Sequence, residues 1–314
     1  MEQKLVIGID IGGTKIDAGI IDSSGKILKK TRIYTKAHEG LDAVVQRIYD
    51  AIELVAADSK ASIRGIGIGA PGQVDVKNGI VIFAPNMGWK DVELRRLIHE
   101  RYKLPVEIEN DANCGALAEA KFGAGSGANS LIWITVGTGI GGGIIISGKL
   151  MQGAGFAGGE IGHMTIKEKG PVCGCGNKGC LEALAAGPAI IHQIRDKIIA
   201  GTQTSILKIV DDDLNKITVE IAAKAADMGD NLSHKELNRA GKYLGIGVAN
   251  LANILNPEVI ILGGGVMEVA GHHLLKIIKN TVQNRALSQA RANLRIELAR
   301  LGNDAGLIGA SLLI

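Results

Sequence analysis

One histidine and three cysteines lie within eighteen positions near the middle of the chain, at His163, Cys173, Cys175 and Cys180. Three thiolates and one imidazole suit a closed tetrahedral zinc site, in which no coordination position is left open for catalysis. The glycines between the cysteines permit a tight knuckle. We therefore expect a structural zinc ion, and the alternative is four reduced side chains without a metal.

Two glutamates, Glu160 and Glu182, stand at the edges of this cluster. A closed site of three thiolates and one imidazole has no position left for a carboxylate. We therefore expect the glutamates to bind something other than the zinc ion. In this interpretation the metal fastens the loop, and the chemistry of the protein takes place beside it.

A glycine-rich turn near the N-terminus has the composition of a phosphate-binding loop. Residues 4–10 and 15–22 are predicted to be strands, and the turn DIGGTK at 10–15 joins them. Its glycines let backbone N–H groups approach a phosphate, and a carboxylate at the strand end can hold Mg²⁺ through water. The spacing is that of neither a P-loop nor a Rossmann fingerprint, and an ordinary hairpin turn is the alternative. The candidate residues are Asp10, Gly12, Gly13, Thr14 and Lys15.

The same kind of element recurs in the second half of the chain. Residues 131–136 are predicted to be a buried strand, and VGTGIGGG at 136–143 supplies a second glycine turn, so that two such loops favour a phosphate clamp. Another buried strand, at 258–262, leads into a glycine triplet. This triplet is expected either to lie against the base or ribose of a nucleotide or to form a tight strand-to-helix turn. The candidate residues are Gly137, Thr138, Gly139, Gly263, Gly264 and Gly265.

The segment ENDAN at 109–113 ends a strand predicted over 106–109 and begins a helix predicted over 112–122. A carboxylate at such a junction could accept the proton of an attacking hydroxyl, which makes Asp111 the candidate general base. Asn110 beside it could hydrogen-bond a polyol. Asp111 could equally cap the helix, because Asp and Asn are preferred caps, and the residues alone leave both interpretations open.

Hydrophobic periodicity predicts an α/β protein. A helix is expected over 40–57, and strands are expected over 27–34 and 63–69. The region 183–256 is expected to be mainly helical, with a capping box at 233–236 before its last helix.

The recurrence of the glycine-turned hairpin predicts two related lobes. The first lobe is expected to comprise residues 1–115 and to be completed by a C-terminal helix at 303–314. The second and larger lobe, with the zinc knuckle, is expected to comprise residues 116–302. No linker separates the two, so we expect them to share a cleft.

The bulk composition excludes several classes of protein. The 314 residues are 46% hydrophobic with a net charge of +3, as in a globular protein of about two domains. The densest basic run, Lys29, Lys30 and Arg32, is expected to be a solvated edge strand rather than a nucleic-acid site. The sequence shows neither a signal peptide nor a run long enough to span a bilayer, so a cytoplasmic protein is expected. Cys114, apart from the other cysteines, is expected in the core.

Together these motifs resemble the ROK family, named for repressors, open reading frames and kinases. The turn at 10–15 alone is typical of a superfamily, whereas the glutamate–histidine segment and the cysteine knuckle are highly specific. The resemblance runs from end to end and comprises DIGGTK at 10–15, GAPGQVD at 69–75, ENDAN at 109–113, VGTGIGGG at 136–143, GGEIGH at 158–163 and CGCGNKGCLE at 173–182.

The resemblance implies a two-lobed fold like that of actin and hexokinase, which is ribonuclease H-like, with ATP and Mg²⁺ bound in the cleft. It implies phosphorylation of a hexose hydroxyl, first of all of glucose to glucose 6-phosphate, and we expect a homodimer or homotetramer. Asp111 matches the general base of the family, and His163 with the three cysteines matches its zinc ligands. The residues matched to sugar binding are Gly72, Gln73, Asn86, Asn110, Asp111, Glu160, His163 and Glu182.

Other functions remain as alternatives. Repressors of this family carry an N-terminal winged helix-turn-helix before the DIGGTK-like segment, which begins here at residue 10, so DNA binding is the weaker expectation. A non-catalytic sugar sensor would be expected to lack Asp111. N-acetylmannosamine, N-acetylglucosamine, mannose, fructose and allose remain possible sugars, because pocket shape sets such choices, and polyphosphate remains a possible donor.

Overall fold

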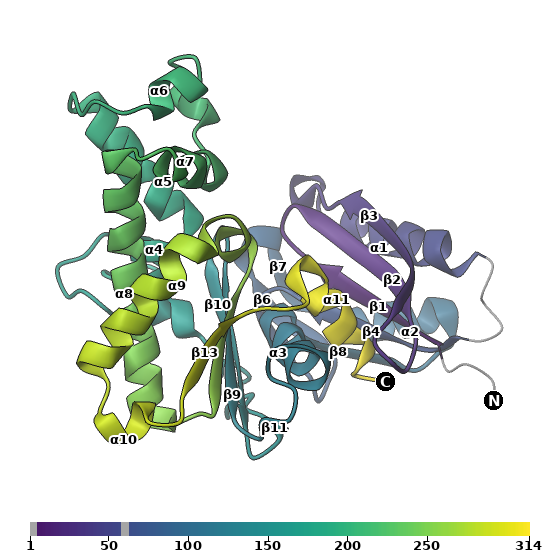
Figure 1. Cartoon of the computed structure of the whole chain (residues 1–314). Helices are drawn as coiled ribbons and strands as arrows, with labels where there is room; N and C mark the ends of the chain where they lie inside the picture. The colour runs from purple at the N-terminus through teal and green to yellow at the C-terminus, as the bar shows by residue number, and fades with distance from the viewer. Residues whose placement is uncertain (1–4, 58–62) are drawn as a thin grey trace. The chain divides into compact units, whose positions relative to one another are not determined.

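The computed structural model describes residues 5–57 and 63–314, which form an α/β protein as predicted (Figure 1). The predicted strands at both glycine turns and at the ENDAN segment are all present. The strands are β1 (Leu5–Ile11), β2 (Lys15–Ile21), β3 (Ile27–Tyr34), β4 (Ile63–Ala70), β5 (Gln73–Asp75), β6 (Ile80–Ala84), β7 (Trp89–Val92), β8 (Val106–Asn110), β9 (Leu131–Val136), β10 (Ile140–Ile146), β11 (Lys149–Leu150), β12 (Val259–Gly263) and β13 (Arg295–Leu298).

The region between β11 and β12 is mainly helical from residue 181 onward, as predicted. Short 3-10 turns lie at η1 (Ala37–Glu39), η3 (Pro85–Met87), η4 (Ile161–His163), η5 (Leu214–Lys216) and η6 (Gly302–Asp304). The α-helices are α1 (Leu41–Ala56), α2 (Leu94–Tyr102), α3 (Asp111–Phe122), α4 (Leu181–Ala185), α5 (Gly187–Ile199), α6 (Ile206–Ile209), α7 (Val219–Asp227), α8 (Asn231–Leu255), α9 (Gly265–Arg285), α10 (Ser288–Arg291) and α11 (Ala305–Ser311).

Two sheets of like order organise the chain. The first has the order β3-β2-β1-β4-β8, in which β1 pairs antiparallel with β2 and parallel with β4, and β4 pairs parallel with β8. The second has the order β11-β10-β9-β12-β13, in which β12 pairs parallel with both β9 and β13. A third, smaller sheet has the order β5-β6-β7. In both larger sheets parallel strands end at one edge, where ligands of α/β folds commonly bind.

The chain divides into two compact units. The predicted boundary at 115/116 differs from this division, because α3 belongs wholly to the first unit, where it packs against α11. A Cβ on Gly309 would meet the backbone of Cys114 at 1.8 Å, so only glycine allows these two helices to approach so closely. The first unit comprises Met1–Gly127, Gly143–Gly159 and Asn303–Ile314, and the second comprises Ala128–Gly142 and Glu160–Gly302.

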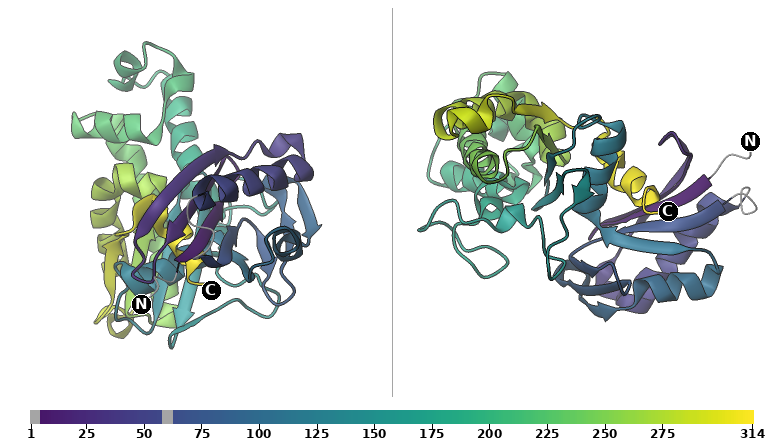
Figure 2. Two further views of the ribbon diagram at one scale, coloured as in Figure 1. Left: turned by 90° about the vertical axis from the view of Figure 1, so that its right-hand side faces the viewer. Right: turned by 90° about the horizontal axis from the view of Figure 1, so that it is seen from below.

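Aliphatic side chains form the core of the first unit. The strands β1, β2 and β4 are buried on both faces, and α1 packs along β2 and β3 (Figure 2). Cys114 is fully buried, as predicted. Residues central to this core are Ile7, Ile9, Ile11, Ile48, Ile52, Ile66 and Ile68.

In the second unit the long helices α8 and α9 pack side by side (Figure 1). The predicted capping box at 233–236 is wrong, because Asp230 is the N-cap of α8. Its carboxylate accepts the Ser233 backbone N–H at 2.8 Å, and Ser233 is buried inside the first turn. The Asp230 carboxylate accepts an N–H three residues later, which is the same spacing as in a capping box, and this explains why the sequence pattern misplaced the helix start by three residues.

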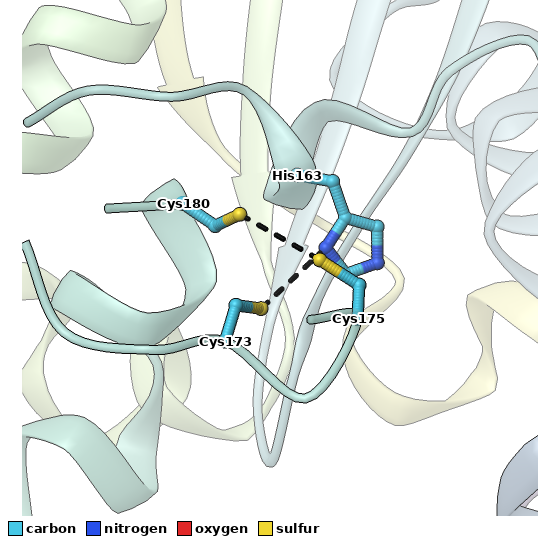
Figure 3. A group of neighbouring side chains, drawn as sticks. All are labelled: His163, Cys173, Cys175 and Cys180. Carbon is cyan, nitrogen blue, oxygen red and sulfur yellow. Dashed lines mark hydrogen bonds between the residues drawn. The ribbon is translucent and has the colours of Figure 1, made fainter. Parts of the chain in front are cut away.

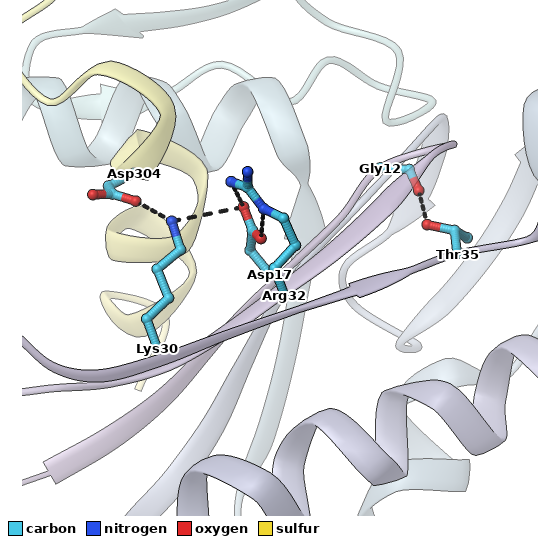
Figure 4. Close-up of polar contacts among 6 residues, drawn as sticks. All are labelled: Gly12, Asp17, Lys30, Arg32, Thr35 and Asp304. Carbon is cyan, nitrogen blue, oxygen red and sulfur yellow. Dashed lines mark hydrogen bonds and ion pairs between the residues drawn. The ribbon is translucent and has the colours of Figure 1, made fainter.

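The basic run of residues 29–32 lies on an edge strand, β3, as predicted, but two of its members do not face solvent alone. Arg32 donates to both carboxylate oxygens of the buried Asp17, at 2.6 and 2.9 Å (Figure 4). Lys30 lies 3.7 Å from Asp17 and also pairs with Asp304. These cations hold the pKa of Asp17 below its ordinary value although burial raises it. The run therefore serves to stabilise a buried carboxylate.

Among the helices of residues 5–57 and 63–314, we find none with the length and apolar character needed to cross a bilayer.

Candidate functional site

In the first unit, three predicted site segments meet because the ends of three parallel strands are adjacent. Asp10 near the end of β1 is paired in register with Gly69 of β4, and Gly69 is paired with Glu109 of β8. The next pair, Ala70 and Asn110, ends the two strands. The carboxyl ends of parallel strands lie at one edge of a sheet, so this register places the glycine turn, the GAPGQVD segment and ENDAN side by side.

The junction of β8 and α3 shows which residue of ENDAN caps the helix. The cap of α3 is Asn110, whose Oδ1 accepts the N–H groups of Ala112 and Asn113 at 2.9 and 3.1 Å. Asp111 is therefore the first residue of the helix rather than its cap, and its Oδ1 accepts the Ala112 N–H at 2.7 Å. The Asn110 Nδ2 also donates to the carbonyl oxygen of Gly72, at 3.0 Å, which fixes the amide.

Sequence reasoning missed the role of Glu109 beneath this junction. Glu109 is 3% exposed, and its Oε1 accepts both the Asn110 N–H at 2.7 Å and the Asn113 Nδ2 at 3.0 Å. Its Oε2 accepts the Gln152 Nε2 at 2.6 Å. The buried carboxylate thus ties the ENDAN segment to the stretch after β11. The position of Glu109 within the motif was visible, but nothing in the sequence indicated Gln152.

Asp10 lies in an environment that disfavours its ionised form. Burial, together with the nearby charges of Asp111 and Asp17, raises the pKa of Asp10 to about 7. A Cβ on Gly306 would lie 2.6 Å from the carboxylate, so the start of α11 closes over it. Carboxylates that raise one another's pKa suit a bound divalent cation, because the ion would offset their repulsion. The residues present thus fit the predicted Mg²⁺.

The glycine turn at 10–15 is held by Thr35, which sequence reasoning also missed. The Gly12 N–H donates to the carbonyl oxygen of Lys15 at 2.9 Å and closes the turn. The Thr35 hydroxyl donates to the Gly12 carbonyl oxygen at 2.7 Å, and its N–H donates to the Thr14 carbonyl oxygen at 2.9 Å (Figure 4). Because Thr35 donates hydrogen bonds to these two carbonyl oxygens, the turn has a fixed shape for a ligand.

The predicted sugar-facing residues of the first unit lie around this turn. Asn86, in η3, is exposed, and its Cβ is 3.8 Å from the position that a Cβ would take on Gly13. Gly72 has a φ of 82°, and a Cβ there would meet the backbone of β6, so the position requires glycine. The Gln73 Nε2 donates to the Gly155 carbonyl oxygen at 2.5 Å. This bond turns Gln73 toward the 143–159 segment.

In the second unit the predicted phosphate loop follows β9. The Gly137 N–H donates to the Gly139 carbonyl oxygen at 2.8 Å, and the Gly137 carbonyl oxygen accepts the Gly187 N–H at 2.8 Å. Thr138 between them is exposed. A Cβ on Gly137 would meet nothing within 4 Å, so the loop leaves room for a ligand on this side.

The glycine triplet at the end of β12 forms the tight strand-to-helix turn that was one of the two predictions for it. A Cβ on Gly263 would meet the Trp133 ring at 2.2 Å, and Gly264 has a φ of 84°, so packing and backbone explain these two. Gly265, the first residue of α9, has nothing within 4 Å of the place for a Cβ. Because Gly263 is paired with Thr135, this helix start lies beside the loop after β9. Gly265 thus leaves room for a ligand, and its contact with the base or ribose of a nucleotide stays a prediction.

The metal candidates of the second unit converge as the sequence predicted. One ligand atom from each of His163, Cys173, Cys175 and Cys180 lies within 4.8 Å of the others. The His163 Nδ1 is 3.7 Å from the Cys173 Sγ, and the Sγ atoms of Cys175 and Cys180 are 3.7 Å apart (Figure 3). This group of four side chains is called the cysteine knuckle below.

The donor set of the knuckle fits zinc chemically. Burial raises the pKa of Cys173, and it raises that of Cys180 to about 12, whereas the Asn177 backbone N–H lowers that of Cys175. Without a cation the two buried thiols would remain protonated, and a coordinated metal deprotonates such thiols. The positive φ of 91° at Gly176 supplies the reversal between the cysteines.

Glu182, at the start of α4, links the knuckle to the phosphate loop. Its Oε2 accepts the Ile140 N–H at 2.9 Å, and the Cys173 Sγ lies 3.6 Å from its Oε1. A Cβ on Gly139 would lie 2.6 Å from Oε2, so this glycine lets the carboxylate approach. The side chain thus spans two predicted site elements that lie about forty residues apart in the sequence.

Glu160 precedes η4 and lies near the other face of the shared histidine. The Glu160 Oε2 is 3.9 Å from the His163 Nε2, whereas the His163 Nδ1 faces Cys173. Both side chains are partly exposed, at 53% for Glu160 and 35% for His163. One ring nitrogen is therefore directed to the knuckle and the other to a carboxylate and solvent.

The model of the ROK family matches residues 6–314 of the chain. The chain belongs to the ROK family. This confirms the resemblance inferred from the motifs. The ROK fold, of the actin and hexokinase type, accounts for the two units and for their two sheets of like order.

Members of the ROK family with different functions resemble the chain. A glucokinase of Halalkalibacterium halodurans is 39% identical over 318 residues, which cover 100% of this chain and 96% of that protein. A xylose repressor of Caldicellulosiruptor bescii is 34% identical, over 97% of this chain and 76% of the repressor. The structure of a ROK family glucokinase from Streptomyces griseus, in complex with glucose and AMPPNP, matches with a TM-score of 0.88 at 36% identity and covers 98% of each chain.

Proposed function

We propose that this protein transfers the γ-phosphoryl group of ATP to a hydroxyl of glucose and forms glucose 6-phosphate. The observation that carries the proposal is the pair of carboxylates Asp10 and Asp111, which lie near each other in the first unit, at the ends of the two strands β1 and β8 that flank β4. A kinase needs one carboxylate for the metal and one for the proton of the attacking hydroxyl. The likeness to proteins named glucokinase supports glucose as the sugar.

In the proposed mechanism Asp111 accepts the proton of the sugar hydroxyl as that oxygen attacks the phosphorus. General bases contribute typically about 10²–10⁴-fold to turnover. Its place at the first turn of α3, beside the Asn110 cap, fixes the carboxylate, whose Oδ1 accepts the Ala112 N–H. Asn110, whose Nδ2 keeps one N–H beyond the bond to Gly72, would donate to a second sugar hydroxyl.

Phosphoryl transfer asks the protein mainly to position the triphosphate and to stabilise its charge. We assign this to the turn at 10–15 and to the loop Gly137–Gly139, with Gly265 beside the nucleotide. Mg²⁺ held by Asp10, directly or through water, would neutralise developing charge on the phosphates. Lys15, which follows the turn, adds a positive charge near Asp10.

We assign the remaining sugar contacts to Gly72, Gln73 and Asn86 in the first unit and to Glu160, His163 and Glu182 in the second. Zinc held by the knuckle would fix the His163 ring through Nδ1 and leave Nε2 for a sugar hydroxyl, as outer groups orient metal-bound histidines elsewhere. The same ion would hold the loop that carries Glu160. We further propose that the enzyme works in the cytoplasm as a homodimer or homotetramer.

A panel of sugars with ATP and Mg²⁺, followed by coupled detection of ADP, tests the activity. We expect the highest kcat/KM for glucose among glucose, mannose, fructose, allose, N-acetylglucosamine and N-acetylmannosamine. Polyphosphate in place of ATP, with glucose 6-phosphate as the readout, tests the donor. Loss of ADP release in Asp111→Asn guards against a contaminating kinase. A higher kcat/KM for another sugar would overturn the choice of glucose, and no turnover with any sugar would overturn the kinase assignment.

A sugar-dependent DNA-binding protein is the second candidate, because xylose repressors match 97% of the chain at 34% identity. Binding of the purified protein to labelled genomic fragments, with and without sugar, tests it. Sequence-specific retardation that a sugar releases, together with no phosphorylation of any sugar, would favour this function over the kinase.

A further inference from the structure

Two helices of the second unit, α7 and α9, bring a carboxylate and two imidazoles together far from the cysteine knuckle in the sequence. Asp227 is the last residue of α7, and His272 and His273 lie in the middle of α9. The Nε2 atoms of His272 and His273 are 3.0 and 2.9 Å from the same carboxylate oxygen, Oδ1 of Asp227. One possible ligand atom from each of the three lies within 4.8 Å of the others. These three residues are called the histidine cluster below.

A third histidine stands beside the histidine cluster. The ring of His234, in the first turn of α8, meets the ring of His273 edge-on, with the ring centroids 5.7 Å apart. A cavity of about 350 Å³ opens here, and it is large enough for an ion with its water ligands. Its lining residues are His234, Leu237, Asn238, His272, His273, Lys276 and Ile277.

The geometry is poorly explained by hydrogen bonds alone. The His272 Nε2 forms a hydrogen bond with Asp227. The His273 Nε2 lies as close to the same carboxylate, but the angles of a hydrogen bond are not met there. This nitrogen is buried and has no hydrogen bond among the described residues. A buried ring nitrogen without a hydrogen bond carries a desolvation cost, which a metal–nitrogen bond would remove. The 2.9 Å between this nitrogen and the Asp227 oxygen is also close to the separation of two ligand atoms that bind one metal ion.

The chemistry of the donors selects the class of ion. Imidazole nitrogen suits zinc, nickel, copper and cobalt, whereas magnesium and calcium prefer oxygen ligands. Two histidines and one carboxylate leave at least one position open for water or for His234. Lys276 lines the same cavity and opposes a cation, so the site depends on the carboxylate of Asp227 to balance that charge.

The geometry points to a second metal site, in which Asp227, His272 and His273 bind one divalent ion of the zinc class. The ion would join the C-terminal end of α7 to the middle of α9, which pack against each other in the second unit. This site shares no residue with the cysteine knuckle or with the proposed sugar and nucleotide contacts. The test of this metal site is therefore independent of the test of the proposed kinase activity.

Metal uptake by the untagged protein tests the site. Zn²⁺ is titrated into the protein against a chromophoric chelator, and the parent is compared with His272→Gln/His273→Gln. We expect the parent to take up about one equivalent more than the double variant, because the knuckle is intact in both. Asp227→Asn, which keeps the side-chain shape, is expected to weaken the same binding step by at least about tenfold.

His192→Gln is the matched control, because His192 also lies near an aspartate, Asp196, at 3.4 Å on a helix of the same unit, but without a second histidine. It should bind as much zinc as the parent. Co²⁺ separates the two sites by their spectra, since thiolate ligands give intense charge-transfer bands and a site of nitrogen and oxygen ligands does not. The double variant should lose only the weak bands.

Three results would overturn the site. Equal zinc uptake by the parent and His272→Gln/His273→Gln would leave only a hydrogen-bonded cluster without a metal. A loss as large in His192→Gln would mean unspecific binding by surface histidines. Unchanged binding in Asp227→Asn would remove the carboxylate from the ligand set. Circular dichroism of the metal-free variants confirms that each is folded, so that lost uptake reports on the ligands.

Discussion

The junction of β8 and α3 and the loop from Glu160 to Cys180 carry half of the proposed sugar contacts, and different interactions hold the two regions in place. The junction continues a buried strand into a helix, and its polar side chains are held by hydrogen bonds to the buried Glu109 and to backbone N–H groups. The loop has one 3-10 turn and two isolated bridges, and most of its side chains are at least partly exposed.

The comparison teaches where each region is vulnerable. At the junction the backbone conformation is supported by both adjoining elements, so a change of one functional side chain should leave the fold intact. The loop is cross-linked by the four knuckle side chains and by backbone hydrogen bonds, such as those that the Gly179 carbonyl oxygen accepts from the Ile166 and Lys167 N–H groups. A change of one ligand should therefore disorder residues that it does not touch.

Asp111→Asn should have the largest effect on activity. The amide cannot accept the sugar proton, so we expect kcat to fall by about 10²–10⁴-fold, with a melting temperature close to that of the parent. Steady-state kinetics with ATP and glucose, together with thermal unfolding, measure both. A variant that turns over at nearly the parent rate would remove Asp111 from the role of base. A variant that is unfolded would show that the junction is less robust than we infer.

Cys175→Ser should show the opposite pattern in the loop. We expect loss of the zinc ion, a lower melting temperature, and a KM for glucose raised by about tenfold or more through the released His163 ring. Metal analysis and glucose kinetics are the measurements. Cys114→Ala is the matched control, because Cys114 is buried in the first unit and should keep the full zinc content. Zinc content near zero in the parent would contradict the knuckle altogether.

Glu109→Gln tests whether the buried carboxylate orders the junction. The amide offers one acceptor where the carboxylate offered two, so a donor is left unpaired at a cost of about 1–3 kcal/mol. We expect a lower melting temperature and a higher KM for glucose. Adding Gln152→Glu reverses donor and acceptor across the 2.6 Å bond and should restore part of both. Additive losses in the double variant would show that this bond does not support the junction.

The smallest expected effect is that of Asp10→Asn on how the stability of the metal-free protein depends on pH. The pKa of Asp10 is raised from 3.8 to about 7, so the folded protein holds this proton more tightly than the unfolded chain. Stability of the metal-free protein should therefore fall as pH rises from about 4 to about 7, and the loss is complete above that range. At pH 8 the melting temperature of the variant should be roughly 5 °C above that of the parent. At pH 4 the two melting temperatures should be the same.

Magnesium sharpens the same test. Added Mg²⁺ should raise the melting temperature of the parent at pH 8 and leave Asp10→Asn unchanged, because the cation replaces the proton at the carboxylate. Differential scanning calorimetry at both pH values gives the four melting temperatures. Equal melting of parent and variant at pH 8 without Mg²⁺ would show that Asp10 is not under electrostatic strain.

Most of the local structure could be predicted because it follows from local patterns. The alternating and apolar runs located β1, β2, β3, β4, β8, β9 and β12, and helical spacing located α1 and α3. The start of α8 was misplaced because the pattern at 233–236 satisfies the same spacing rule as the true cap, Asp230. The place of the whole of α3 and of residues 143–159 in the first unit was not predictable either, because it depends on tertiary contacts such as those of α3 with α11, nearly two hundred residues away.

Some residues of the candidate site could likewise be predicted from the sequence, and others could not. The knuckle could be predicted because its candidate ligands are rare residue types at close spacing. Three thiolates and one imidazole also indicate zinc among the metal ions. Glu109 with Gln152, Thr35 behind the glycine turn, and the approach of Glu182 to Ile140 could not, because each joins segments that are distant in the sequence. A polar residue that stabilises such a turn has no compositional signal of its own.

The sequence by itself determined the α/β class, the membership of the ROK family, and the residue types available for phosphate, sugar and metal. These depend on side-chain chemistry and on periodicities of a few residues. The tertiary structure alone decided that Asn110 rather than Asp111 caps α3, that Asp10 and Asp111 are neighbours, and that Asp227 meets His272 and His273. Each depends on the register of strands or the packing of helices, where contact between distant residues sets pKa and coordination.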